Sequence, residues 1–279
     1  MSATKALTRG ELRFDVTVDG PPDGEPVVLL HGWPQHSDSW DGVVAELTAA
    51  GYRTVRMDQR GYSPGARPRG RRAYRITGLV ADAAALIDEF CGGSAHVVGH
   101  DWGAGVAWGL AAEQPGKVRS VTAVSVPHVG AFLRAMVTSR QGLKSWYMLF
   151  FQLPWLPEWL LRRYLARVLV QGGQSAEHAR RDAAAFVEPG AMTGALNWYR
   201  AIPFVDPRRA GEPVRTPTLM VWGDGDVAID RGCVDRCADY VQGPYQLEIL
   251  HGVSHWIPDE APEQLSALLL PHLKRWSAE

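Results

Sequence analysis

The stretch Ser94-Ala-His-Val-Val-Gly-His-Asp-Trp-Gly-Ala-Gly-Val-Ala107 decides the fold of this 279-residue chain. Its apolar run, 95–98, is typical of a buried strand, and the small residues from Ala104 onward favour a helix. Glycines stand two residues before and two residues after Asp101. This order of strand, glycine-flanked turn and helix predicts a nucleophile elbow, which holds one side chain on a sharp turn. A carboxylate in that position attacks an sp³ carbon and leaves an alkyl ester on the enzyme.

Composition and charge exclude several classes of protein. Hydrophobic residues make up 46% of the chain and charged residues 21%, as in ordinary globular proteins. The formal net charge of −1 gives no overall electrostatic reason to expect a nucleic-acid or anionic membrane partner. No run approaches the roughly 18 apolar residues of a membrane span, and residues 1–10 lack an apolar signal core. We therefore expect a cytoplasmic protein, a monomer or homodimer, with no nucleic acid and no membrane as partner.

The cysteines do not predict a disulfide framework or a metal site. There are three, and Cys233 and Cys237 lie four residues apart. No further His or Cys pair completes a zinc-binding set around them. We expect buried or neutral thiols, no bound metal and no cofactor.

Strand and helix patterns alternate along most of the chain. Apolar or alternating runs predict strands at 11–18, 26–30, 52–57, 95–98, 118–126, 217–222 and 245–250. Amphipathic stretches between them predict helices, which indicates an α/β fold with a mostly parallel, doubly wound sheet. The alternation stops at 128–212, where aromatic-rich helical patterns lie between Pro and Gly breaks. We expect a core from 1–127 and 213–279, with 128–212 inserted as a helical cap.

Two further polar residues follow predicted strands. Asp226 comes after the strand at 217–222, and His255 after the strand at 245–250. The carboxyl ends of parallel strands meet in one crevice, so these residues can meet Asp101 there. In this chain order they form a nucleophile–acid–histidine triad, in which His255 takes a proton from water and Asp226 orients it. Taken singly, Asp226 could be a turn former, as could Asp224, and His255 a helix cap.

The sequence His31-Gly-Trp-Pro34 follows another buried strand. In this architecture that position contributes one half of an oxyanion hole, and the residue after the nucleophile contributes the other. The backbone N–H groups of Trp33 and Trp102 would then hold an oxyanion. The alternative is a plain tight turn ahead of a helix. The Trp33–Pro34 bond is a candidate cis peptide.

With these motifs together, the chain resembles the α/β-hydrolase-fold epoxide hydrolases, which use an aspartate nucleophile and are related to haloalkane dehalogenases. The matching segments span nearly the whole chain: HGWP at 31–34, GHDWGA at 99–104, WYMLFFQLP at 146–154, LNWYR at 196–200, GDGD at 223–226 and GVSHW at 252–256. HDWG is shared with the dehalogenases, whereas LNWYR is typical of the epoxide hydrolases.

The resemblance implies that Tyr147 and Tyr199 are the two catalytic tyrosines of the cap. Epoxide opening expels an alkoxide, which is a poor leaving group, and two phenols of pKa about 10 can hydrogen-bond that oxygen and protonate it. Together with Trp33 and Trp102, these tyrosines would also bind the substrate. The alternative for Tyr147 is a core aromatic residue in an aromatic-rich helix.

The chain departs from the family at two places. Gln35 stands where these enzymes usually have Glu, as in some haloacetate dehalogenases. Those dehalogenases carry Arg after the nucleophile, whereas this chain has Trp102. The family's Gly-x-Ser-x-Ser/Thr segment is altered to Gly61-Tyr-Ser-Pro-Gly65. These differences bear on which substrate the protein accepts more than on the reaction mechanism.

The sequence thus favours a hydrolase that opens a small apolar epoxide with water to a vicinal diol. The apolar residues of the expected cap, among them Trp155 and Trp159, point to an apolar substrate. Two alternatives remain open. The first is haloalkane dehalogenation by the same Asp101, because the indole N–H of Trp102 could bind a halide. The second is a non-catalytic ligand-binding protein, because a fold does not determine a function.

Overall fold

A single sheet organises the protein. The structure, a computed structural model, describes residues 3–206 and 209–277. Within this described part, eight strands lie in the order β1-β2-β4-β3-β5-β6-β7-β8. Strand β2 pairs antiparallel with β1 and β4, and all other neighbours pair parallel. The strands are β1 (Ala3–Arg9), β2 (Leu12–Asp19), β3 (Pro26–Leu30), β4 (Arg53–Met57), β5 (Ala95–His100), β6 (Val118–Val124), β7 (Thr218–Gly223) and β8 (Tyr245–Leu250).

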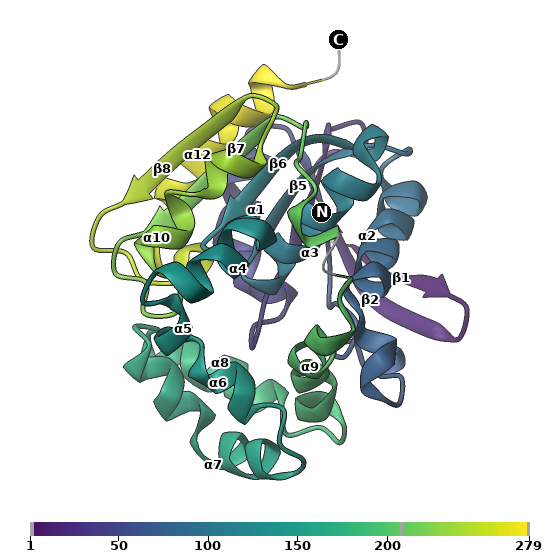
Figure 1. The fold of residues 1–279 in the computed structure, drawn as a ribbon. Coiled ribbons are helices and arrows are strands. Elements are labelled where there is room, and N and C mark those ends of the chain that lie inside the picture. Colours follow the sequence, from purple (N-terminus) through teal and green to yellow (C-terminus); the bar gives the residue numbers. More distant parts are fainter. Residues whose placement is uncertain (1–2, 207–208, 278–279) are drawn as a thin grey trace.

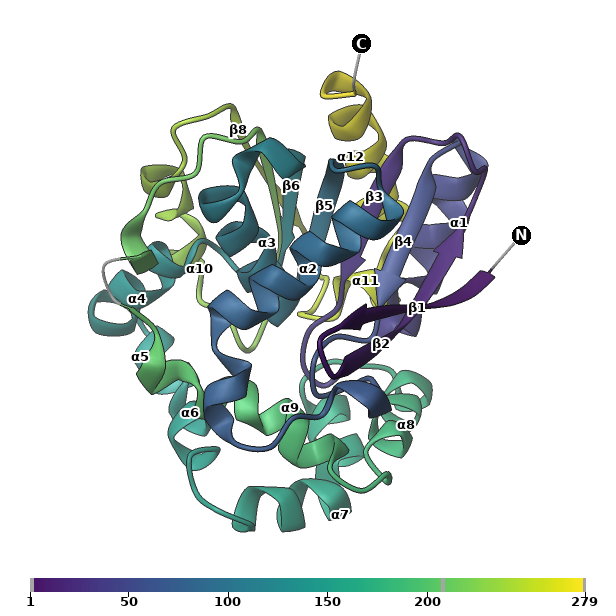
Figure 2. The ribbon, with the colours of Figure 1, turned by 90° about the vertical axis from the view of Figure 1, so that its right-hand side faces the viewer.

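Helices cover both faces of this sheet (Figure 2). Helices α1 (Asp41–Ala49) and α12 (Pro262–Arg275) contact each other on one face, and α2 (Ile76–Phe90) and α3 (Trp102–Glu113) on the other. Alternate residues of β3 point to the two faces, Val27 and Leu29 into one hydrophobic core and Val28 and Leu30 into the other. Burial on both faces explains why the central strands are continuous apolar runs. The expected α/β fold with a mostly parallel, doubly wound sheet is therefore confirmed.

A helical segment connects β6 to β7. It contains α4 (Val129–Thr138), α5 (Gln141–Lys144), α6 (Trp146–Phe150), α7 (Leu156–Gln171), α8 (Ala176–Ala185) and α9 (Ala191–Arg200), and residues 129–206 include no strand. In Figure 1 these helices lie below the sheet, at the end toward which the parallel strands run, with α7 farthest away. The short helices α10 (Arg231–Val234) and α11 (Ile257–Glu260) follow β7 and β8. The sequence expectation of a helical cap at 128–212 includes residues 207–208, which lie outside the described part of the chain, and the role of this segment as a cap stays a prediction.

Some local expectations were incomplete. Strand β1 was not expected, because this edge strand is mostly exposed and polar. The sequence pattern at 258–276 predicts one closing helix, but the structure divides this stretch at Ala261 into α11 and α12. All three cysteines are buried and unbridged, and burial raises the pKa of the Cys233 thiol to about 12, as expected of neutral thiols. Among the described residues, no helix is both long and apolar enough to cross a membrane.

Candidate active site

The turn between β5 and α3 presents Asp101 in an unusual backbone conformation. Asp101 has φ 51° and ψ −119°, a region that residues with a side chain seldom occupy and that costs about 1–3 kcal/mol. Neighbouring segments approach this turn closely. A Cβ atom on Gly103 would lie 2.1 Å from the Leu30 carbonyl oxygen, and one on Gly32 would lie 2.3 Å from the Asp101 Cβ. Glycine is required at both positions so that the two strand ends can meet.

Two backbone amides hold the carboxylate of Asp101. The N–H of Trp33 donates to Oδ1 over 2.7 Å, and the N–H of Trp102 also donates to this carboxylate. Burial acts to raise the pKa of Asp101, but hydrogen bonding to His255 and its nearby charge more than offset this and hold the pKa below its ordinary value. The side chain keeps 15% of its surface exposed. Asp101 is thus an accessible carboxylate whose Oδ1 is fixed by the Trp33 amide.

His255 lies between two carboxylates. Its Nδ1 is 2.7 Å from Oδ2 of Asp226, and its Nε2 is 3.6 Å from Oδ2 of Asp101. The other oxygen of Asp226 accepts the backbone N–H groups of Ala228 and Ile229 over 2.7 and 2.8 Å. Burial acts to lower the pKa of His255, but the charges of Asp226 and Asp101 overcome this effect and raise it to about 10. The structure thus brings the three expected residues together. Asp224 does not belong to this group, because its carboxylate pairs with the exposed His251.

Buried polar groups fix the backbone of His255, and sequence reasoning did not find them. The ring N–H of His100 and the hydroxyl of Ser125 each donate to the His255 carbonyl oxygen over 2.9 Å. Burial lowers the pKa of His100 to about 4, so this ring is neutral. His100 belongs to β5 and Ser125 follows β6, so the loop that carries His255 is tied to the centre of the sheet. A histidine before the nucleophile is the only sequence signal for this contact.

Helix α5 supports the loop that carries Asp226. The Nζ of Lys144 donates to the carbonyl oxygens of Asp226 and Ile229 over 3.0 and 3.2 Å. The amide of Gln141 donates to the Ala228 carbonyl oxygen over 2.9 Å and accepts the N–H of Asp230 over 2.7 Å. The helical segment therefore stabilises a loop of the sheet domain more than 80 residues later in the chain. No local pattern in the sequence predicts this contact.

The two tyrosines implied by the family resemblance lie next to each other. Tyr147 belongs to α6 and Tyr199 to α9, and their ring centroids are 5.9 Å apart. Burial raises the pKa of both phenols, and the negative charge of Asp101 raises it further. A hydrogen bond between the two side chains partly opposes this rise at Tyr147. Both phenols therefore keep their protons at neutral pH, and the negative charge of Asp101 acts on both of them.

Aromatic rings surround Tyr199. Its ring centroid lies 5.1 Å from that of Trp102, 6.0 Å from Trp33 and 5.0 Å from Phe151. The side chain of Trp102 also hydrogen-bonds to Tyr199. The expected oxyanion-hole residues thus line the same space as the tyrosines with their indole rings. The Trp33–Pro34 peptide bond is cis, as expected.

The residues at which the chain departs from the family pattern are linked to the helical segment, directly or through Asp259. Gln35 is buried, and its amide donates over 2.6 Å to Asp259, which also pairs with Arg181 of α8 over 2.8 Å. A Cβ on Gly61, where φ is 93°, would lie 2.8 Å from the backbone of Gly194 in α9. Both departures therefore concern the contact between the sheet domain and the helices that carry the tyrosines. In the part of the chain that the structure describes, no cluster of His, Cys, Asp and Glu could hold a metal.

Comparison with known proteins agrees with this geometry. The family model for the alpha/beta hydrolase fold matches residues 25–262. The chain is 34% identical to the AB hydrolase superfamily protein YfhM of Bacillus subtilis, over 94% of this chain and 95% of that protein. It is 31% identical to Epoxide hydrolase A of Mycobacterium tuberculosis, over 94% of each chain. The crystal structure of Epoxide Hydrolase A from Mycobacterium thermoresistibile superposes with a TM-score of 0.88 at 27% identity and covers 100% of both chains.

Proposed function

The chain belongs to the α/β-hydrolase-fold family and, within it, to the epoxide hydrolases, and from this premise we propose that it opens a small apolar epoxide to a vicinal diol through an alkyl ester on Asp101. Helices α4 to α9 then act as the cap, because they supply both tyrosines. Water is the second substrate. No step of this reaction requires a cofactor.

In the first step Oδ2 of Asp101 attacks an epoxide carbon. This oxygen is the suitable nucleophile because Oδ1 accepts the N–H of Trp33. The carbon–oxygen bond of the ring breaks as the ester bond forms, and the departing oxygen takes a proton from the Tyr147–Tyr199 pair. Burial favours the neutral phenols, so they act as donors rather than as anions that would repel the alkoxide.

Ester formation then prepares His255 for the second step. It removes the negative charge of Asp101, which is one of the two charges that raise the pKa of His255. The pKa of the imidazolium falls, its proton passes to the tyrosine pair, and the neutral ring becomes a base. His255 then takes a proton from water while Asp226 stabilises the imidazolium that forms.

The activated water attacks the ester carbonyl at Asp101. The oxyanion develops at the oxygen that faces the Trp33 and Trp102 amides, which already donate to the carboxylate of the free enzyme. When this intermediate collapses, the bond between the carboxyl carbon of Asp101 and the substrate oxygen breaks, and the diol leaves with the proton from His255. The proton that remains on the new carboxyl group of Asp101 passes to His255, which restores the carboxylate and the imidazolium. The enzyme returns to its starting state.

The observation that carries this proposal is the pair of neutral phenols, buried Tyr199 and half-buried Tyr147, beside a carboxylate nucleophile. The test is a panel of aryl and aliphatic epoxides and matched haloalkanes, assayed with the wild type, the Tyr147→Phe/Tyr199→Phe double variant and Tyr164→Phe. Tyr164 is an exposed tyrosine of α7 and serves as the control. We expect diol formation by the wild type and the control and its loss in the double variant. Wild-type protein that turns over no epoxide contradicts the proposal.

One observation favours haloalkane dehalogenation as the second candidate. A halide leaving group needs N–H donors, and the indole nitrogen of Trp33 is buried without a hydrogen-bond partner among the described residues. The indole of Trp102, however, is engaged by Tyr199. Release of halide in the same panel without epoxide turnover would reverse the order of the two functions.

A further inference from the structure

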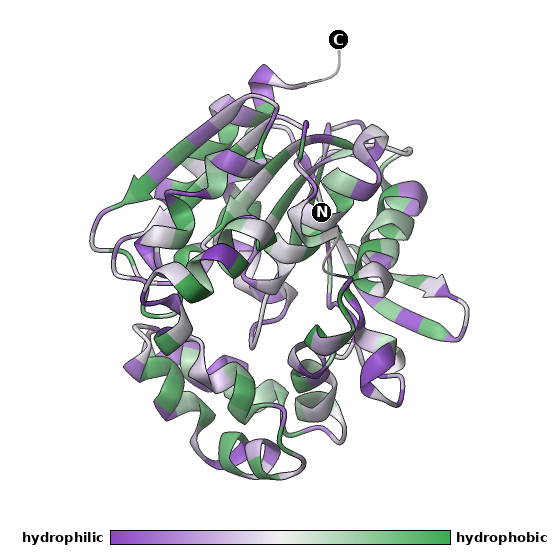
Figure 3. Cartoon of the chain, in the orientation of Figure 1, coloured by the Kyte–Doolittle hydropathy of each residue, from purple (hydrophilic) through white to green (hydrophobic). Residues whose placement is uncertain are grey.

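The outer side of α6, of the loop after it and of α7 exposes large apolar side chains beside arginines. Leu149 is 77% exposed and Trp155 73% exposed. Figures 1 and 2 agree in placing α7 at the end of the molecule farthest from the sheet, and Figure 3 shows hydrophobic and hydrophilic residues mixed along it. We call this the α6–α7 surface; it consists of Trp146, Leu149, Leu153, Trp155, Trp159, Arg162, Arg163 and Arg167.

Packing does not account for these exposed residues. Helix α7 buries Leu161, Leu165 and Leu169, which recur every four residues along one side. Trp159, Arg163 and Arg167 follow the same spacing on the exposed side. Trp159 therefore adds nothing to the core. Large apolar side chains exposed on successive segments of the chain, two of them at one pocket, indicate an interaction site.

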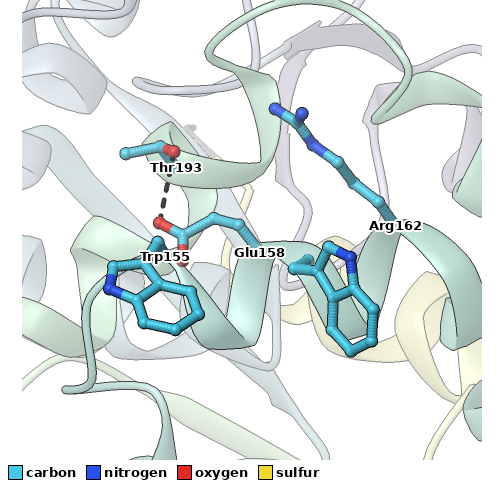
Figure 4. A pocket seen from close by; sticks show the side chains of 5 residues that line it. Trp155, Glu158, Arg162 and Thr193 are labelled. Atoms are coloured by element: carbon cyan, nitrogen blue, oxygen red, sulfur yellow. Dashed lines mark hydrogen bonds between the residues drawn. The ribbon is translucent and has the colours of Figure 1, made fainter.

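Trp155 and Trp159 border a surface pocket of about 390 Å³, which Arg162 and Thr193 also line (Figure 4). The carboxylate in this pocket belongs to Glu158, and Arg200 contacts both its oxygens over 2.6 and 2.9 Å. The negative charge of Glu158 is thereby neutralised by Arg200, which belongs to the same helical segment. The charge that the pocket presents to an incoming molecule is that of Arg162.

The charge of the chain is unevenly distributed. Between residues 129 and 200 there are nine Arg or Lys residues and four Asp or Glu residues, a net charge of +5, whereas the whole chain carries −1. The near-zero overall charge, from which no membrane partner was expected, therefore conceals a cationic helical segment. On α7, Arg162, Arg163 and Arg167 are exposed beside the tryptophans.

We propose that the α6–α7 surface binds an anionic phospholipid bilayer. Tryptophan is favoured at the level of the lipid headgroups, and arginine is attracted by the negative surface potential of anionic lipids. A second copy of the chain fits less well, because two such faces related by a two-fold axis would place their arginines against each other. Binding in this way would bring the helical segment to the apolar phase in which apolar molecules dissolve.

The test is co-sedimentation with vesicles of phosphatidylcholine alone and of phosphatidylcholine with one-third phosphatidylglycerol. We expect the wild type to sediment with the anionic vesicles and to be released by salt. The variant Arg162→Gln/Arg163→Gln/Arg167→Gln should bind them about a hundredfold more weakly. The variant Trp155→Ser/Trp159→Ser should also lose binding, at least about tenfold. Circular dichroism melting of each variant establishes that it is folded.

A matched control separates this surface from a general effect of charge. Arg13, Arg69 and Arg75 are exposed on the sheet domain, and replacing all three by Gln removes the same charge. This control should bind anionic vesicles as the wild type does. The proposal is overturned if the wild type binds neither kind of vesicle, if the control loses as much affinity as the α7 variant, or if sedimentation equilibrium shows a dimer that the tryptophan variant abolishes. None of these measurements depends on epoxide turnover.

Discussion

The Nε2 atom of His255 lies 3.6 Å from Oδ2 of Asp101, whereas its Nδ1 lies 2.7 Å from Oδ2 of Asp226. The shorter distance is a full hydrogen bond that orients the ring, and the longer one leaves Oδ2 of Asp101 weakly engaged. An oxygen in that position can attack an incoming carbon. In the proposed mechanism, the same ring then activates the water that attacks the ester carbonyl. One histidine would thus leave the nucleophile available in the first step and serve as base in the second.

Replacing His255 by Gln should trap the covalent intermediate. The carboxylate of Asp101 remains able to attack, but the loss of the base slows ester hydrolysis by roughly 10²–10⁴-fold. We expect one equivalent of epoxide to be consumed per enzyme and the adduct to appear in the intact protein mass. His251→Gln, in the exposed pair with Asp224, is the matched control and should turn over normally. Full consumption of substrate without an adduct by His255→Gln would contradict the role of the histidine.

Folding stability should report the charge of His255. Its pKa in the folded protein, about 10, lies above the ordinary value of 6.5, so folding favours the imidazolium. This stabilisation is complete below pH about 6.5 and is lost as the pH rises through about 10. The difference in free energy of unfolding between the wild type and His255→Gln should narrow by at most about 1.4 kcal/mol per pH unit over that range. Urea unfolding at several pH values measures it, and a constant difference would contradict the raised pKa.

The two tyrosines should share the work of protonating the alkoxide. Tyr147→Phe or Tyr199→Phe alone leaves one phenol beside the departing oxygen, so each should lower the rate of ester formation less than the double variant. General acids contribute about 10²–10⁴-fold, which is the loss expected of the double variant. Rapid-mixing measurements of the first turnover give these rates. If the double variant formed the ester at the wild-type rate, the tyrosines would not be the acids.

Gln35 should be required for stability because its amide donates to Asp259. Gln35→Glu places a second carboxylate at that buried contact, and we expect a loss of about 1–3 kcal/mol in the free energy of unfolding at neutral pH. Gln246→Glu makes the same change beside Glu248 on the exposed surface, where the effect should stay within about 0.5 kcal/mol. Chemical denaturation of both variants measures the difference. Equal effects would mean that the Gln35 contact adds no stability.

The sequence predicted the sheet and the triad because both depend on local patterns. Continuous apolar runs followed by Asp101, Asp226 and His255 place polar residues at strand ends, and parallel strands bring those ends together. The Trp33 amide followed from the same rule, since His31-Gly-Trp-Pro34 also ends a strand. In the structure Asp226, the residue that the pattern named, contacts His255, whereas Asp224 contacts His251.

Contacts between distant segments could not be predicted in this way. Gln35 and Asp259 are 224 residues apart, and nothing near either residue indicates the pair. The same holds for Lys144, which reaches the Asp226 loop from another part of the fold. Strand β1 was not predicted because it is an exposed edge strand, and its sequence lacks the apolar pattern of a buried strand. These features depend on packing between segments, and only the tertiary structure reveals them.

The central claim is that Asp101 forms the ester, and a single turnover in heavy-oxygen water tests it most directly. Enzyme in excess over epoxide completes one reaction, after which the diol and the peptide that contains Asp101 are analysed by mass spectrometry. If water attacks the ester carbonyl, the heavy oxygen appears in the Asp101 carboxylate and the diol carries none. If water attacks the epoxide directly, the diol carries the heavy oxygen, Asp101 stays unlabelled, and the proposed mechanism is wrong.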